Sequence, residues 1–247
     1  MISNSAFPVH DEVGWGQRTF EAGCIAGASI LLALHCIRVI SCKSLWTWPL
    51  GLAIIGGALS ADFTSGMVHW FCDTWFHDSL PFFGRRFLRP FRVHHVNPND
   101  FLRRDFIDTN GDVSMLVIVV LLCALLIPLK SAGELWLVVY LLAFSFVAWP
   151  TNQVHQWAHM PQPPRWIARL QRHGLILSRP AHLEHHVAPY ATNYCIATGW
   201  LNRLLSEIRF FDRLEMLITR ITGLQPREDD TAYPIGMASN TGRDTNK

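Results

Sequence analysis

Residues 113–129 read VSMLVIVVLLCALLIPL, seventeen positions without a charged side chain. At about 1.5 Å per residue, an α-helix of this length spans roughly 25 Å, close to the hydrocarbon core of a bilayer. Residues 22–40, 45–61 and 135–151 are similarly apolar, with a snorkelling Arg38 near the end of the first. The sequence therefore predicts an all-α integral membrane protein with about four transmembrane helices, at residues 22–40, 45–61, 113–129 and 135–151.

Composition supports this fold class. Half of the 247 residues are apolar and 16% are charged, whereas about 25% is usual in soluble domains. A net charge of +2 without a basic block argues against a nucleic-acid partner. The six cysteines are scattered and lack the spacing of a thiolate metal site or a disulfide framework.

Histidines gather in four segments outside the apolar runs. These are SADFTSGMVHWFCDTWFHDSLP (60–81), RPFRVHHVNPND (89–100), TNQVHQWAHM (151–160) and RPAHLEHHVAPY (179–190). We expect the second and fourth apolar helices to continue beyond the bilayer as stems that carry the first and third segments. Positions i, i+3 and i+4 of a helix share one side, so the imidazoles of His182, His185 and His186 can converge on one point.

This concentration of imidazoles predicts a metal site. Nine residues have the required spacing, and they exceed the four to six ligands that one ion usually takes, so two ions are expected. The predicted ligands are His69, Asp73, His94, His95, His155, His159, His182, His185 and His186. We predict no catalytic residue beyond them.

The identity of the metal depends on the donor set. Zinc metalloproteases place Glu beside the first His of an i, i+4 pair, and Gln156 stands there instead. Imidazoles with one carboxylate suit iron, and two irons at the mouth of a helical bundle are the layout of membrane oxygenases. A single pair such as His155 and His159 could also cap a helix end. A bis-histidine haem electron carrier is a further alternative, although it leaves the histidine triplet unexplained.

Four histidines fall outside this pattern. His10 and His35 are isolated, and we interpret them as surface and packing residues. His77 and His173 lie near the clusters without their spacing, which favours indirect or interfacial roles.

Basic residues predict the orientation in the membrane. The connections between helices one and two and between three and four carry only Arg38, Lys43 and Lys130. The opposite side, with every histidine cluster, is arginine-rich, which predicts that the clusters and both termini are cytoplasmic. Its basic residues are Arg18, Arg85, Arg86, Arg89, Arg92, Arg103, Arg104, Arg165, Arg169, Arg172 and Arg179.

Two segments mix basic and apolar residues at helical spacing, namely residues 164–177 and 200–222. They are expected in the membrane interface or in the cap over the site. Residues 1–223 are predicted to form a single membrane domain, and the polar residues 224–247 to form a disordered tail.

The sequence also resembles a known family. The motifs ADFTSGMVHWFCDTW (61–75), FRVHHVNPNDFLRRDFIDTNGD (91–112), VHQWAHM (154–160), HGLILSRPAHLEHHVAPY (173–190) and YCIATGWLNRLL (194–205) are together similar to the Kua family of lipid desaturases. The likeness runs from about residue 57 to residue 230.

The resemblance implies a di-iron enzyme that uses O₂ and two electrons to convert a 1-O-alkyl ether phospholipid, plasmanylethanolamine, into the vinyl ether plasmenylethanolamine. The family's histidine pattern falls on the eight histidines above and its acidic member on Asp73. An electron donor such as cytochrome b5 or a ferredoxin is implied. Arg85, Arg86, Arg89 and Arg92 could meet the lipid phosphate or simply set the topology. The family also includes a plant phosphatidylglycerol desaturase, so desaturation of an acyl chain is the nearest alternative.

Overall fold

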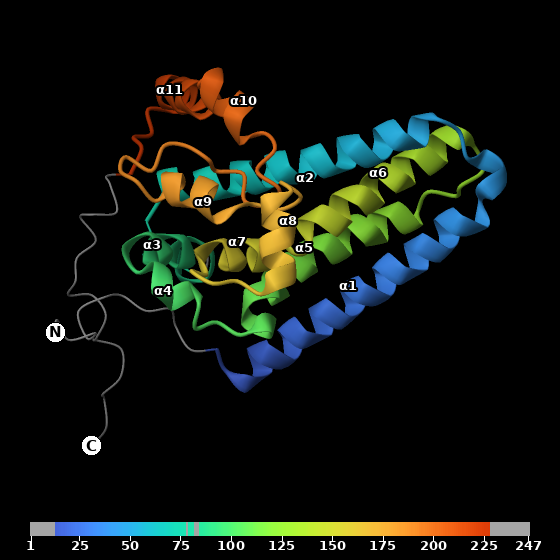
Figure 1. The fold of residues 1–247 in the computed structure, drawn as a ribbon, viewed down its shortest axis with the longest axis horizontal. Coiled ribbons are helices and arrows are strands. Elements are labelled where there is room, and N and C mark those ends of the chain that lie inside the picture. Colours follow the sequence, from blue (N-terminus) through green and yellow to red (C-terminus); the bar gives the residue numbers. More distant parts are fainter. Residues whose placement is uncertain (1–12, 78, 82–83, 228–247) are drawn as a thin grey trace.

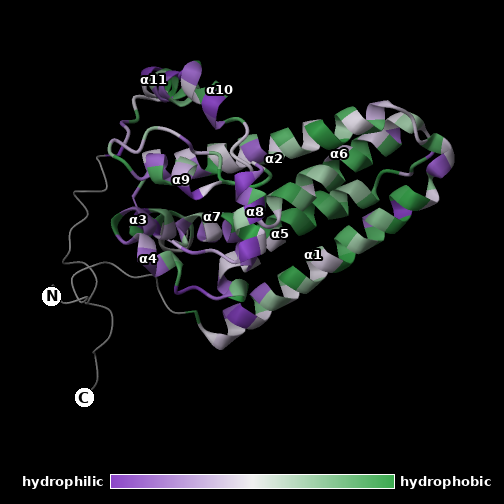
Figure 2. Ribbon diagram, in the orientation of Figure 1, coloured by the Kyte–Doolittle hydropathy of each residue, from purple (hydrophilic) through white to green (hydrophobic). Residues whose placement is uncertain are grey.

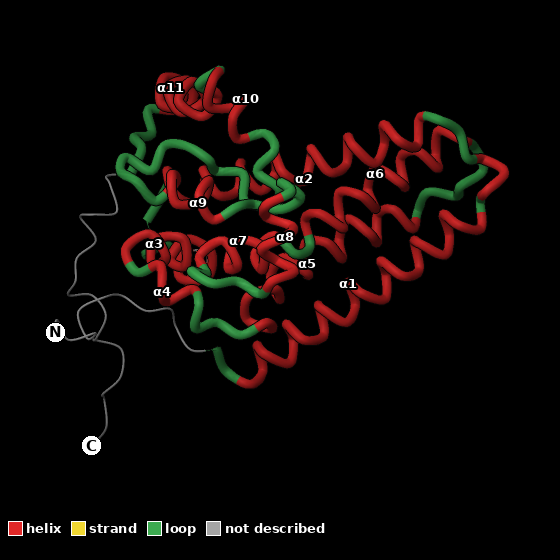
Figure 3. Tube along the Cα trace, viewed as in Figure 1, coloured by secondary structure: helices red, strands yellow, loops and turns green. Residues whose placement is uncertain are grey.

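A computed structural model describes residues 13–77, 79–81 and 84–227, and for Arg85 and Arg86 it describes the backbone alone. Every regular element within these ranges is a helix (Figure 3). Four helical segments are long and apolar enough to cross a membrane. They are α1 (Trp15–Ser41), α2 (Pro49–Thr74), α5 (Phe106–Leu125), and α6 (Ala132–Ala148) with its continuation into α7 (Thr151–His159). The predicted fold class is confirmed.

The ends of these helices differ from the apolar runs because polar residues extend them. α2 continues to Thr74 and carries His69 and Asp73. α5 begins at Phe106, where the Asp105 carboxylate accepts hydrogen bonds from the backbone N–H groups of Ile107 and Asp108. The same helix ends at Leu125, ahead of Pro128, which cannot continue it.

Close backbone approaches hold the bundle together. α2 packs along α6, and α1 packs along α5. A Cβ atom on Gly57 would lie 2.3 Å from the backbone oxygen of Tyr140, and one on Gly111 would lie 2.4 Å from Cβ of Glu21. Small residues that let helices touch are typical of membrane bundles, where little hydrophobic force draws helices together.

Short helices form a cap at one end of the bundle, which we call the histidine end (Figure 1). The long helices are largely hydrophobic and the cap is more hydrophilic (Figure 2). Besides α7, the cap contains η3 (Gly84–Leu88), α3 (Arg89–Val96), α4 (Pro98–Phe101), α8 (Arg165–Arg172), α9 (Arg179–His185), α10 (Asn202–Glu207) and α11 (Phe210–Thr222). A short helix, η2 (Lys43–Leu45), precedes α2 in the connection from α1.

The C-terminal part of the cap is tied to α2. Phe211 of α11 packs against Trp70 of α2 and against Tyr194. The buried Asp62 carboxylate accepts hydrogen bonds from the backbone N–H groups of Thr198, Gly199 and Leu201. These contacts fix residues 194–201 beside the part of α2 that leads to His69. The predicted disordered tail comprises residues 224–247, of which 224–227 are described and 228–247 lie outside the described residues.

Candidate metal centre

The nine predicted ligands come from four helices and meet at the histidine end. α2 contributes His69 and Asp73, and α3 contributes His94 and His95. α7 contributes His155 and His159, and α9 with its C-cap contributes His182, His185 and His186. All the histidines except His186 are buried, and His186 is half-buried. Residues up to 117 positions apart in the chain, from 69 to 186, therefore form one centre.

The first of two clusters, group A, consists of His155, His159, His182 and His186. The Nε2 atom of His182 lies 2.9 Å from the Nε2 atoms of both His155 and His159, and 3.1 Å from that of His186. The Nε2 atoms of His155 and His159 are 3.3 Å apart. Four ring nitrogens thus surround one point.

The second cluster, group B, consists of His69, Asp73, His95 and His185. The Nε2 atoms of His95 and His185 lie 3.0 Å apart. One carboxylate oxygen of Asp73, Oδ2, is 3.3 Å from Nε2 of His69, 3.6 Å from that of His95 and 3.5 Å from that of His185. Asp73 therefore brings its negative charge to a set of three imidazoles.

His94 lies between the two groups. Its ring can complete either a set with the four histidines of group A or a set with the three histidines of group B. Its Nε2 atom is buried and has no hydrogen-bond partner among the described residues. The arrangement offers ligands for two adjacent ions.

The histidine triplet of α9 is divided between the groups. His182 and His186 point into group A, whereas His185 points into group B. The expectation that all three converge on one point is wrong. Positions i+3 and i+4 lie about 60° and 40° to opposite sides of position i around a helix, so a triplet can face two neighbouring points.

The spacing of the ring nitrogens fits a bound metal. A neutral imidazole has one N–H donor and one lone pair, so four converging Nε2 atoms cannot all be satisfied by one another. Metal–imidazole bonds of about 2.0–2.1 Å place neighbouring ligand nitrogens about 2.9–3.4 Å apart for angles between octahedral and tetrahedral values. The distances in group A lie in this range.

Burial keeps these imidazoles in the form that binds metals. It lowers the pKa of His94, His95, His182 and His186 below the ordinary histidine value, and repulsion from neighbouring histidines adds to the effect. The rings are therefore neutral near pH 7, and each has a lone pair available.

Backbone carbonyls orient two ligands of group B. The Nδ1–H group of His69 donates to the backbone oxygen of Tyr194 at 3.1 Å, and that of His185 donates to the backbone oxygen of Thr192 at 2.7 Å. Each bond turns the Nε2 lone pair toward the centre. Tyr190 stacks on His95 with the ring centroids 5.0 Å apart. Sequence reasoning missed the role of the Thr192 and Tyr194 carbonyls, because backbone acceptors have no side-chain signature.

A chain of amides supports group A. Gln156, which stands between two ligands of α7, donates to the backbone oxygens of Phe101 and Arg104. Its own side-chain oxygen accepts from Gln153, whose oxygen in turn accepts from Asn110 of α5. In the sequence, Gln156 served only to argue against a protease. In the structure, its side chain connects α7 to the end of α4 and to the segment between α4 and α5.

The other histidines lie outside both groups. His35 is buried in α1, where its Nε2 atom lies 3.0 Å from the backbone oxygen of Leu121, consistent with a packing role. His77 and His173 are exposed. His10 lies outside the described residues. The haem alternative is disfavoured, since the converging Nε2 atoms of group A leave no space for a porphyrin between facing rings.

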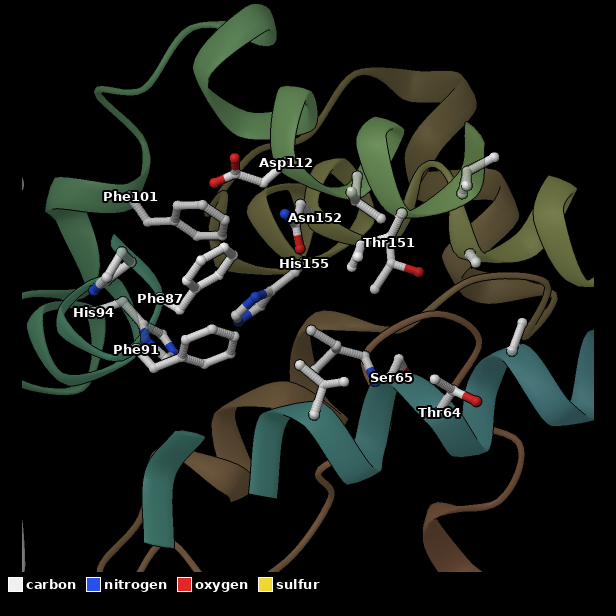
Figure 4. Close-up of a pocket in the computed structure, with 18 of the residues that line it drawn as sticks. Thr64, Ser65, Phe87, Phe91, His94, Phe101, Asp112, Thr151, Asn152 and His155 are labelled. Atoms are coloured by element: carbon white, nitrogen blue, oxygen red, sulfur yellow. Dashed lines mark hydrogen bonds between the residues drawn. The ribbon is translucent and has the colours of Figure 1, made fainter. Parts of the chain in front are cut away.

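A groove of about 500 Å³ reaches the centre from the side of the bundle. His94 and His155 line its inner end, beside the rings of Phe87, Phe91 and Phe101 (Figure 4). Side chains of α2, α5 and α6 form most of the rest of its wall. This volume is typical of small-molecule sites.

The fold and the site together define the class. A membrane bundle that ends in two adjacent, buried sets of side chains that could hold metal ions, reached by a largely apolar groove, is the architecture of a membrane enzyme for hydrophobic substrates. The chain belongs to the lipid desaturase domain family, which matches residues 58–229. It is thus a desaturase, an oxidoreductase of lipid metabolism, and the predicted resemblance is confirmed.

Three relatives show the range of the likeness. The plasmanylethanolamine desaturase of Myxococcus xanthus is 44% identical over 78% of this chain and 68% of its own length. Plasmanylethanolamine desaturase 1 of Mus musculus is 43% identical over 74% of this chain and 69% of its own. The chloroplastic fatty acid desaturase 4 of Arabidopsis thaliana is 34% identical over 71% of this chain and 54% of its own length. No solved structure matches the chain.

Proposed function

We propose that this desaturase holds two iron ions and introduces the vinyl ether double bond of plasmenylethanolamine into plasmanylethanolamine. The observation that carries the proposal is the pair of metal-binding groups that share His94. A ligand set of imidazoles with a single carboxylate suits iron better than it suits a hard cation, which prefers oxygen ligands. The substrate follows from the names of the two relatives with over 40% identity.

The two irons would supply activation of O₂ for removal of hydrogen from unactivated carbon. The reaction balances when one hydrogen leaves C1 and one leaves C2 of the alkyl chain, and O₂ also receives two electrons and two protons. O₂ then accepts four electrons in all and becomes two molecules of water. The electrons come from a partner protein, for which we propose a cytochrome b5 or a ferredoxin.

The chain's own side chains position the reaction. Group A and His94 would hold one ion, and group B with Asp73 the other. The carbonyls of Tyr194 and Thr192 fix the rings of His69 and His185. Phe87, Phe91 and Phe101 line the inner end of the groove and reduce the access of water to the reacting carbons.

The histidine end is proposed to face the cytoplasm. Its loops and short helices are arginine-rich, which is the pattern of a cytoplasmic side. Arg89 and Arg92 of α3 lie in this cap, with Arg92 buried. A contact of Arg85, Arg86, Arg89 and Arg92 with lipid phosphate stays a prediction, and the side chains of the first two lie outside the described residues.

Desaturation of an acyl chain, as in phosphatidylglycerol, is the second candidate, because chloroplastic fatty acid desaturase 4 is also a relative. Lipid analysis of cells without ether-lipid desaturation, with and without this chain, separates the two candidates. Acid-labile vinyl ethers that depend on the chain support the proposal. A new acyl double bond without vinyl ethers contradicts it and supports the alternative.

A further inference from the structure

The groove lies between two helices that are not main packing partners. α2 packs mainly on α6 and α1 mainly on α5, and the groove runs between α2 and α5 with α6 behind it. α2 contributes Ala61, Thr64, Ser65 and Val68. These positions share one face of the helix, because they recur at intervals of three and four residues. α5 contributes Val113, Leu116, Val117, Val119 and Val120, and α6 contributes Phe144 and Ala148.

The charged side chains that line the groove lie toward one of its ends. Asp100, Arg104 and Asp112 line the part nearest the histidine end. Beyond Asp112 the contribution of α5 is entirely apolar as far as Val120, eight positions or about 12 Å along the helix. The hydroxyl group of Thr64 donates to the carbonyl of Ser60 within α2, and that of Thr151, at the start of α7, donates to the carbonyl of Val147 in α6. The part of the groove farther from the histidine end thus suits a hydrocarbon chain.

The groove is open to the surroundings of the bundle. Val68 of α2 is 48% exposed, and Leu116 and Val119 of α5 are each 56% exposed. All three line the groove and also lie on the outer surface of candidate membrane helices. Lipid chains that surround the bundle therefore reach the groove without leaving the membrane.

We propose that one hydrocarbon chain of a membrane phospholipid enters this groove laterally between α2 and α5. The chain lies along residues 113–120, and its headgroup stays at the Arg104 end. The inference rests on the proposed function for the identity of the chain, a 1-O-alkyl chain. The histidines line the polar end of the groove, so the carbons next to the headgroup are the ones presented to them. Mid-chain carbons lie against the valines of α5.

The first test measures occupancy of the groove independently of catalysis. A phospholipid with a diazirine in the middle of its 1-O-alkyl chain is incorporated into phosphatidylethanolamine vesicles with the full-length protein. Irradiation and peptide mapping should show labels on residues 113–120 and on Phe144 or Ala148. Excess unlabelled ether phospholipid should suppress these labels but not those on Ile54 and Ile55, which face the surrounding lipid. Labels at residues 113–120 that resist competition would overturn the inference.

The second test fills the groove. In Val68→Trp and Leu116→Trp, a large ring stands at the lateral opening, and kcat/KM for the ether phospholipid should fall by about tenfold or more. Ile55→Trp and Leu122→Trp are matched controls, because both sites are exposed on the same helices but outside the groove. Iron content and melting temperature identify any variant that fails to fold, and in that case the competition experiment decides.

The two tests separate the proposals. Suppose that the wild type forms no vinyl ether, but that a diacyl phospholipid with a diazirine labels residues 113–120 and excess unlabelled diacyl phospholipid suppresses this labelling. The proposed substrate is then wrong and the groove inference stands. If the wild type forms vinyl ethers while the two groove variants fold, bind iron and keep full kcat/KM, the groove inference is wrong and the proposed function stands.

Discussion

The Nε2 atoms of His155 and His182 lie 2.9 Å apart, although 27 positions separate the residues in the chain. Neither ring can donate to every nitrogen that surrounds it, so this contact between α7 and α9 requires a shared proton or a shared metal ion. The same holds for the other nitrogens of group A. The centre of the cap thus consists of groups that can share a proton or hold a metal ion.

We expect His182→Ala to abolish desaturation and to lower the iron content of the purified protein from about two ions per chain. The loss of activity should be larger than the loss of about 10 to 100-fold that is typical when a residue that only orients a ligand is replaced. His173→Ala is the control, because His173 is exposed and lies outside both groups. Iron analysis, visible spectra and vinyl ether formation are the measurements. A protein with one zinc and no iron, or with a haem Soret band, would contradict the assignment.

Asp73→Asn tests the carboxylate of group B. The change keeps the size and one oxygen but removes the negative charge that lies 3.3–3.6 Å from three imidazoles. Activity should fall by about 10 to 100-fold while the fold is retained. The control is Glu207→Gln, a surface carboxylate of α10 paired with Arg203. Near-normal vinyl ether formation by Asp73→Asn, at equal protein level, would remove Asp73 from the site.

The sequence predicts the four membrane helices and the ligand set because both depend on local spacing. Apolar runs identify the spans, and pairs such as His155 and His159 share a helix face wherever the helix lies. Spacing cannot show that His185 leaves the group of His182, because that depends on where α3 and α2 stand. The carbonyls of Thr192 and Tyr194 act through the backbone, which any residue type supplies.

The groove could not be predicted from the sequence either. Its existence depends on α2 pairing with α6 and α1 with α5, and hydrophobic runs alone do not specify partners among four helices. The buried Asp62 could have been noticed, since a carboxylate at the end of an apolar run is unusual. In the structure, it holds the turn at residues 198–201 rather than a metal.

Topology is tested with tags at the two ends of the bundle. A tag after Lys247 should be accessible only after the membrane is permeabilised, and a tag inserted beside Lys43 should be accessible in intact cells. The reason is that the arginine-rich cap favours the cytoplasm, whereas few basic residues flank the opposite connections. The reverse pattern of accessibility would place the metal centre on the other face of the membrane.

Gly66→Ala tests how α2 positions the segment that orients group B. A Cβ atom at Gly66 would lie 2.6 Å from Sγ of Cys195 and 3.2 Å from its backbone nitrogen. The segment must therefore move away from α2, and it carries the Tyr194 carbonyl that accepts from Nδ1 of His69. We expect a loss of stability of about 1–3 kcal/mol from overpacking, and reduced activity because the His69 ring loses its fixed orientation.

The control is Gly51→Ala in the same helix, where an added Cβ meets no atom within 4 Å. Alanine has the higher helix propensity, by about 0.8–1.0 kcal/mol in a helix interior, so this variant should be as stable as the wild type or more stable. Opposite signs for the same substitution at two positions of α2 isolate the contact with Cys195 from helix propensity. Melting temperature in detergent and vinyl ether formation measure the two effects. If Gly66→Ala matched Gly51→Ala in both, residues 194–196 would not be held against α2 as described, and the Tyr194 carbonyl would have no role in orienting His69.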